Sequence, residues 1–252
     1  MNRFLVAAAS LAVGLSMAGL LAGPAPAEPG TDRDRVQIGQ AAAPPQAAPQ
    51  PTPPASSPPI YVPPRRGSPA EVAPAATRGV QMPKLKLLAP EHVGLTVSAQ
   101  PTLYMYVAEA GRIQLLITRS ADPGAAALAS GRIDVKDGPG IWPVRLVDLK
   151  TSLEPGVEYR VTLMFFDRAN SVRATESVLI QRVGEPPELT AMTAGAAPAS
   201  RARTYASAGI WFDALDAVSA AIAAAPSAPG PRADRAALVE QAGLPEIAKL
   251  DR

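Results

Sequence analysis

The chain has 252 residues, a formal net charge of +2 and no cysteine. Near-balanced charge gives no long-range field that would attract nucleic acid, and the lack of cysteine excludes disulfides, thiolate metal sites and a thiol nucleophile. His92 is the single histidine, which excludes a multi-histidine metal centre within one chain.

Residues 1–27 have the three parts of a secretory signal. Arg3 supplies a basic start, residues 4–21 are apolar, and the Ala-Pro-Ala triplet at 25–27 has the small-x-small pattern that signal peptidases cleave. An uncleaved membrane anchor is the alternative, because the apolar stretch approaches the roughly 20 residues that a span needs. Its Ala, Gly and Ser content makes it weakly hydrophobic. We therefore expect an exported, periplasmic or extracellular chain that begins at Glu28 and has no stable membrane anchor.

The sequence predicts a disordered, Pro-rich linker over residues 28–82. Proline makes up 11 of the 29 residues from 41 to 69. Since proline fixes φ and removes a backbone donor, neither a helix nor a central strand is expected there. One stretch combines Tyr61 with the pair Arg65 and Arg66 among prolines. Such a stretch is either a docking peptide for a groove or a solvated spacer.

Residues 83–184 predict a β-sandwich domain. Apolar and polar residues alternate in short runs, as from Val157 to Phe165, which is the period of a half-buried strand. Clusters of Gly, Pro, Asp and Asn separate these runs at roughly 8–15 residue spacing, with no helical period between them. This spacing is typical of an antiparallel sandwich.

One turn narrows the fold further. Leu153, Pro155, Gly156 and Tyr159 have the spacing L-x-P-G-x-x-Y, which resembles the corner of fibronectin type III and related domains. The resemblance implies that the Pro-Gly pair makes the turn, that the leucine packs beneath it, and that the tyrosine hydroxyl bonds to backbone upstream. The alternative is an ordinary hairpin with a Pro-Gly turn.

After a second linker over residues 185–203, residues 204–252 predict a helical hairpin. Apolar side chains spaced by four, three and four residues form one stripe on a helix: Trp211, Leu215, Val218 and Ile222. Asp213 and Asp216 lie away from this stripe, which predicts a second face with little packing. The fold expected is mainly β with an α C-terminus: an immunoglobulin- or fibronectin-like antiparallel β-sandwich followed by a helical hairpin.

The hairpin resembles half of a tetratricopeptide repeat. That motif has a turn glycine, an aromatic residue, two alanines and a closing proline, which correspond here to Gly209, Trp211, Ala214, Ala221 and Pro226. The preceding helix lacks the motif's aromatic residue and leucine, and there is no second copy, whereas stable stacks need about three units. We therefore expect a hairpin with repeat-like packing and no repeat array.

No residue pattern predicts an enzyme. His92 could be combined with Ser98 and Glu91, but no nucleophile elbow frames a serine, so an ordinary polar loop is the favoured interpretation. Asp134 and Asp137 stand beside a turn and are expected to be solvated, so they do not indicate an acid pair for glycoside hydrolysis. No phosphate-binding glycine loop precedes a helix. We therefore expect no catalytic, cofactor-binding or metal-ligating residue, and no cofactor.

Several motifs together resemble one family, called domain of unknown function 928. The resemblance spans about residues 58–250. Its motifs are Tyr-Val-Pro-Pro-Arg-Arg-Gly at 61–67, Leu-Ala-Pro at 88–90, Gly-Leu-Thr at 94–96, Gln-Pro-Thr-Leu-Tyr at 100–104, Leu-Glu-Pro-Gly-Val-Glu-Tyr at 153–159 and Tyr-Ala-Ser-Ala-Gly-Ile-Trp-Phe-Asp-Ala-Leu at 205–215. It implies an exported bacterial protein and assigns no activity and no catalytic residue.

We interpret the chain as an exported, non-enzymatic envelope protein that acts as a binding or interaction module. Its expected partner is an envelope protein or glycan, not nucleic acid. The alternatives are a cell-envelope hydrolase acting on polysaccharide or peptide, and a structural spacer. Eight residues are candidates for structural or interaction roles: Tyr61, Arg65, Arg66, Tyr159, Trp211, Leu215, Val218 and Ile222.

Overall fold

The computed structural model describes residues 57–64, 82–122, 124 and 126–252, which belong to one compact unit. The predicted export signal, most of the predicted Pro-rich linker, and the candidate residues Arg65 and Arg66 lie outside these described residues.

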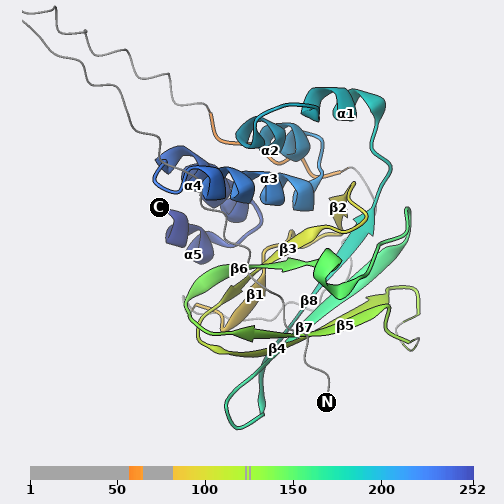
Figure 1. The fold of residues 1–252 in the computed structure, drawn as a ribbon, viewed down its shortest axis with the longest axis vertical. Helices are drawn as coiled ribbons and strands as arrows, with labels where there is room; N and C mark the ends of the chain where they lie inside the picture. Colours follow the sequence, from red (N-terminus) through yellow and green to blue (C-terminus); the bar gives the residue numbers. More distant parts are fainter. Residues whose placement is uncertain (1–56, 65–81, 123, 125) are drawn as a thin grey trace, which may run out of the picture. The chain divides into compact units, whose positions relative to one another are not determined.

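Two sheets face each other in the described part of the chain (Figure 1). The smaller sheet has the order β1-β3-β6 and is antiparallel. Its strands are β1 (Leu85–Leu87), β3 (Thr102–Val107) and β6 (Gly140–Arg145). The larger sheet has the order β2-β8-β7-β4-β5. Its strands are β2 (Gly94–Thr96), β4 (Gly111–Arg119), β5 (Ala129–Val135), β7 (Glu158–Phe166) and β8 (Val172–Arg182).

This strand order is that of an immunoglobulin-like sandwich. The first two short strands divide between the sheets, since β1 pairs with β3 and β2 runs parallel to β8. Side chains alternate in burial along β4 and β7, and those that point between the sheets form the core: Ile113, Leu115, Ile117, Val161, Leu163 and Phe165. The predicted fold class, mainly β with an α C-terminus, is confirmed.

The Pro-Gly turn has the geometry of the sandwich corner. Gly156 takes φ +77°, a conformation that favours glycine, and Leu153 is buried. Tyr159 is fully buried at the start of β7, and its hydroxyl accepts a hydrogen bond from the Glu154 N–H at 3.3 Å. Tyr159 therefore has a structural role, because it connects the turn to the strand that follows it.

The C-terminal part is more helical than the sequence analysis expects. Residues 185–203, interpreted above as a linker, contain α1 (Pro187–Thr193) and the first turns of α2 (Pro198–Ser207). α3 (Trp211–Ala224), α4 (Pro229–Gln241) and the short α5 (Pro245–Ala248) follow. The composition was misleading because a proline in the first helical turn needs no N–H partner, and alanine is the best helix former. The prolines that suggested a linker therefore begin helices.

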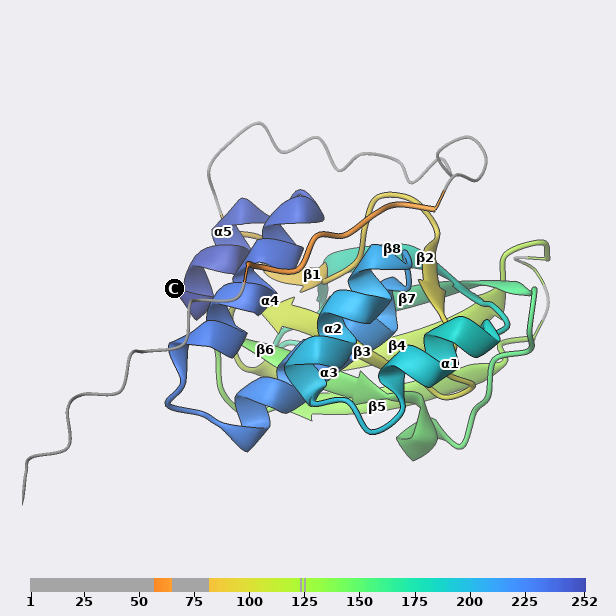
Figure 2. The same cartoon turned by 90° about the horizontal axis from the view of Figure 1, so that it is seen from above.

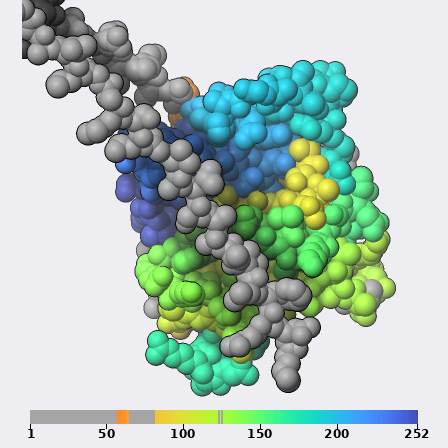
Figure 3. Space-filling view, in the orientation of Figure 1, coloured from red at the N-terminus to blue at the C-terminus, as the bar shows by residue number. Residues whose placement is uncertain are grey.

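The helices pack directly on the sandwich. In the space-filling view the blue helices touch the yellow residues of β2 (Figure 3). The Trp211 Nε1–H donates to the Leu88 carbonyl at 2.9 Å. A Cβ added at Gly94 in β2 would lie 2.5 Å from the Phe212 ring, so only glycine permits α3 to approach this closely. The predicted stripe of Trp211, Leu215, Val218 and Ile222 is buried throughout.

The second face of α3 is also packed, which corrects the expectation for its two aspartates. Asp213 accepts a hydrogen bond from the Val97 N–H at 3.2 Å. Asp216 accepts one from the Tyr104 hydroxyl at 2.9 Å. Helical periodicity located the apolar stripe correctly, but it could not show that the sandwich presents polar donors to the adjacent face. None of the helices in the described ranges is long and apolar enough to cross a membrane.

Candidate functional site

The helical layer holds part of the Pro-rich region against its surface. Residues 57–64, the Pro–Tyr segment, are without helix or strand and pass α4 and α2 (orange in Figure 2). Six residues contact or closely approach this segment from the rest of the chain, and we call them the helical peptide site: His92, Arg203, Ala206, Gly209, Trp211 and Gln241. Of the two interpretations left open for this stretch, the structure therefore shows a docked segment, held by its own chain.

Gln241 at the end of α4 pairs with the segment's backbone from both sides of Ile60. Its Oε1 accepts from the Tyr61 N–H at 2.8 Å, and its Nε2 donates to the Pro59 carbonyl at 3.0 Å. The same Nε2 also donates to the Ala237 carbonyl one helical turn back, which fixes the side-chain orientation. The amide thus imitates a neighbouring strand, and such pairing selects an extended backbone independently of the side chains.

α2 supplies two further backbone contacts. The last carbonyls of a helix have no partner within the helix, and the Val62 N–H donates to one of them, the Ala206 oxygen, at 3.1 Å. Arg203 Nε donates to the Ser57 carbonyl at 3.1 Å, while its Nη2 donates to Asp234 at 2.7 Å. Burial raises the pKa of Asp234, and the Arg203 charge only partly opposes this. The two hydrogen bonds together orient the guanidinium toward the segment.

Tyr61 is the side chain that enters the site, and it is 8% exposed. Its ring meets Trp211 edge-on at 4.9 Å and lies parallel to His92 at 5.8 Å. The Tyr61 hydroxyl is 3.4 Å from His92 Nε2, and His92 Nδ1 is 3.0 Å from the Val93 carbonyl. A carbonyl only accepts, so Nδ1 donates to it, and in the neutral imidazole Nε2 is then the acceptor for the Tyr61 hydroxyl. Burial raises the pKa of Tyr61 well above its ordinary value, so the hydroxyl stays protonated.

Gly209 leaves room for the segment at the α2–α3 turn. It adopts φ +75°, and an added Cβ would lie 2.8 Å from the Val62 carbonyl oxygen and 3.4 Å from Pro64 Cδ. The glycine that suggested a repeat-like turn therefore also permits a close approach of the Pro–Tyr segment.

The segment's outer face is apolar. Ile60 and Val62 flank Tyr61 and point the other way, with 68% and 51% of their surface exposed. The prolines at 58, 59, 63 and 64 have no N–H, so they leave no donor without a partner. Pro59 and Tyr61 are buried while Ile60 and Val62 are exposed, and this alternation is that of an extended peptide lying on a surface.

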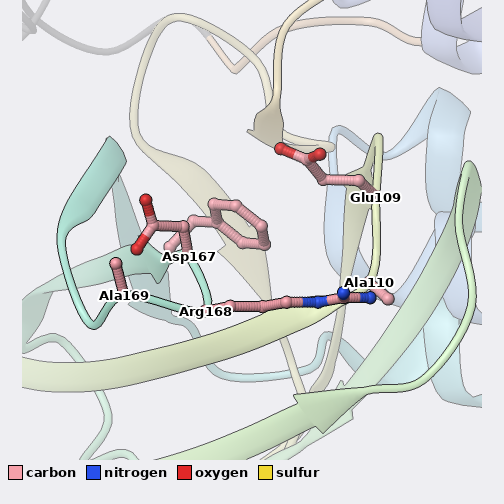
Figure 4. Close-up of a pocket in the computed structure, with 6 residues that line it drawn as sticks. Glu109, Ala110, Asp167, Arg168 and Ala169 are labelled. Atoms are coloured by element: carbon pink, nitrogen blue, oxygen red, sulfur yellow. The ribbon is translucent and has the colours of Figure 1, made fainter.

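A cavity of about 430 Å³ lies between two turns of the sandwich (Figure 4). Its lining residues are Glu109, Ala110, Phe165, Asp167, Arg168 and Ala169. Asp167 accepts from the Ser171 N–H and from Arg173, and these hydrogen bonds lower the pKa of its carboxyl. Glu109 is paired with Lys84. Both acids are thus committed to local partners, so this cavity is the weaker candidate site.

A family model described as Domain of Unknown Function (DUF928) matches residues 73–251. The chain belongs to this family. No curated protein sequence matches the chain significantly.

Solved structures similar to the chain include three β-domains at low identity. Fibronectin(III)-like modules of CbhA from Clostridium thermocellum are 13% identical, with 40% of this chain and 99% of the module covered and a TM-score of 0.25. The sensor domain of the anti-sigma factor RsgI4 from Pseudobacteroides cellulosolvens is 13% identical, covering 42% and 100%, with a TM-score of 0.27. WR4, an MSP family member from C. elegans, is 11% identical, covering 36% and 92%, with a TM-score of 0.23.

Of the predicted candidates that lie in the described residues, two meet in the helical peptide site. They are Tyr61 and Trp211, and the rest of the predicted stripe lies buried in the core. Tyr159 belongs to the sandwich corner. His92, interpreted above as an ordinary loop residue, contacts Tyr61, while Ser98 Oγ accepts from the Gln100 N–H.

Sequence reasoning missed His92, Arg203 and Gln241 as parts of the site. Gln241 stands at the end of a helix and belongs to no recognisable motif, and Arg203 lies in the stretch interpreted as a linker. His92 was conspicuous as the single histidine, but its partner is an aromatic residue from the Pro-rich region, which no local pattern indicates.

Proposed function

We propose that this protein is an exported, non-enzymatic module of the cell envelope that binds an extended segment of a protein at the helical peptide site. The observation that carries the proposal is the pairing of Gln241 with the backbone on both sides of Ile60. Recognition of this kind suits a peptide, because a side-chain amide can match an N–H and a carbonyl two residues apart. A glycan offers hydroxyls in their place, so a protein ligand is favoured.

Export is supported by the basic start, the apolar stretch and the small-x-small triplet of residues 1–27. N-terminal sequencing of secreted material tests this part. A chain that begins at Glu28 is expected, and a retained Met1 or Asn2 would contradict it.

Binding is favoured over hydrolysis by the lowered pKa of Asp167 at the cavity. A general acid needs a raised pKa, whereas hydrogen bonds lower the pKa of Asp167. The glycan alternative rests on this cavity, since exposed charged turns at one end of a sandwich suit sugar hydroxyls. The two candidate sites can be separated by variants that change one and leave the other intact.

The experiment uses the mature chain immobilised and exposed to envelope extract, with retained proteins identified by mass spectrometry and retained glycans by array. Gln241→Ala removes the backbone pairing from an exposed side chain. Arg168→Ala, at the cavity, is the matched control. We expect a protein retained by the wild type and by Arg168→Ala but lost with Gln241→Ala. Retention of a glycan that is lost only with Arg168→Ala would overturn the assignment to the helical peptide site.

A further inference from the structure

The Pro–Tyr segment and its site belong to distant parts of the sequence. Residues 65–81, seventeen in number, join Pro64 to Met82 at the start of the sandwich. Bond lengths allow a connection of that length to span at most about 60 Å. The segment's contacts are made with α2, the α2–α3 turn and α4, and with His92. None of these contacts depends on the segment and the site being in one molecule.

We propose that the helical peptide site also receives the Pro–Tyr segment of a second copy of this chain, so that two copies exchange segments and each supplies Tyr61 to the other. This inference rests on the proposed function, because it names one partner for the same site. The exchanged pair reproduces every contact of the single chain, which is why exchange of an identical element is a low-cost route to a dimer.

The concentration of the protein decides whether the single chain or the exchanged pair predominates. A segment tethered to its own site has a high effective concentration, in the millimolar range for short flexible connections, so the single chain is favoured in dilute solution. Exchange becomes favourable when copies are crowded together.

The exposed apolar pair on the segment favours a second copy over an unrelated peptide. Ile60 and Val62 remain in water when the segment lies on its own chain. An exchanged pair carries two such apolar pairs, one from each copy, and both are available for a contact between the copies. Covering them there gains free energy that an isolated chain does not have.

Two single variants of the full mature chain test the exchange. Tyr61→Ala has a defective segment and an intact site, and Gln241→Ala has an intact segment and an impaired site. Neither can form a native pairing alone or with copies of itself. When they are mixed, the native segment of Gln241→Ala can bind the native site of Tyr61→Ala. In the second pairing of the same dimer, the altered segment of Tyr61→Ala faces the altered site of Gln241→Ala. Native mass spectrometry with one variant isotope-labelled counts the mixed dimers.

The control mixture pairs labelled Tyr61→Ala with a Tyr61→Ala, Gln241→Ala double variant, which offers no native segment. We expect mixed dimers to exceed this control by about tenfold, the ratio that ~1.4 kcal/mol of coupling gives. Equal amounts of mixed dimer in the two mixtures, with circular dichroism showing all variants folded, would overturn the exchange. That result would leave the proposed function standing, because retention of an envelope protein is measured separately.

Discussion

The ring of Tyr61 lies edge-on to that of Trp211, with their centroids 4.9 Å apart, and so joins the Pro-rich region to the helical layer. The same tryptophan donates from Nε1 to the Leu88 carbonyl in the sandwich domain. One buried side chain therefore contacts the Pro–Tyr segment, the helices and the sandwich. Substitution of Trp211 should therefore destabilise all three parts, whereas substitution of Tyr61 should affect the docking of the Pro–Tyr segment alone.

Tyr61→Ala should release the segment without unfolding the domain. The ring's contacts with Trp211 and His92 are lost, and the backbone of this part of the segment is then held only by the hydrogen bonds of Gln241 and Ala206. Hydrogen exchange should accelerate at the Tyr61-position and Val62 amides while the β4 and β7 amides stay protected. Tyr61→Phe keeps the ring and loses only the hydroxyl contact with His92, so it should cost at most about 1 kcal/mol. Unchanged exchange at Val62 in the alanine variant would contradict the docking.

Tyr159 should contribute to stability through both its ring and its hydroxyl. Tyr159→Phe removes the hydrogen bond from the Glu154 N–H, an expected cost of about 1 kcal/mol. Tyr159→Ala also empties a fully buried ring site, and comparable truncations cost roughly 3–5 kcal/mol. Denaturant unfolding measures both values. If the two substitutions were neutral, the corner would not hold the turn against β7 as the geometry indicates.

The sandwich was predictable from the sequence because its evidence is local. Alternation along β7 gives the buried face, and the spacing from Leu153 to Tyr159 gives the corner. Helix α3 was predictable for the same reason, since its period is contained in fourteen residues. Helix α1 and the first turns of α2 were missed because Pro and Ala occur both in linkers and at helix starts, and tertiary packing distinguishes the two.

The site was only partly predictable, because it is made of pairs that are remote in sequence. A proline-flanked Tyr61 suggested a docking peptide, but nothing in its neighbourhood indicates that the partner is Gln241 or His92. Asp213 shows the same limit in the core. Its position on α3 predicted a face with little packing, whereas the sandwich supplies the Val97 N–H to its carboxylate. The residue pattern of a helix or strand shows which of its faces is apolar. It does not show which groups a distant part of the chain packs against those faces.

Trp211→Ala should loosen the helical layer as a whole. It removes a fully buried ring and leaves the Leu88 carbonyl without its donor, an expected cost of roughly 3–5 kcal/mol. Amide protection should fall throughout residues 212–225. Met192→Ala on α1, where the side chain is largely exposed, is the control and should leave protection there unchanged. Full protection of residues 212–225 in the tryptophan variant would mean that the α3 stripe does not depend on this contact.

Asp213 should make the protein more stable in mild acid than at neutral pH. Burial raises the pKa of Asp213 to about 6 from an ordinary value of 3.8, the Asp216 charge adds to this, and hydrogen bonds from Thr96 and the Val97 N–H oppose it. Between these two values the folded state binds a proton that the unfolded state does not. The contribution to the free energy of unfolding is therefore complete below pH 3.8 and is lost as pH rises through about 6.

Asp213→Asn isolates this contribution, because the amide keeps an oxygen to accept from the Val97 N–H but does not titrate. The free energy of unfolding of the wild type minus that of the variant, measured by urea titration across this range, should decrease from pH 4 to pH 6 and then level off. Asp216→Asn is the matched comparison, since that carboxylate accepts from Tyr104 one helical turn away. It should shift the midpoint of the Asp213 transition downward by removing the neighbouring negative charge. A difference between wild type and Asp213→Asn that stays constant with pH would show that the carboxylate remains charged at the interface of α3 and the sandwich.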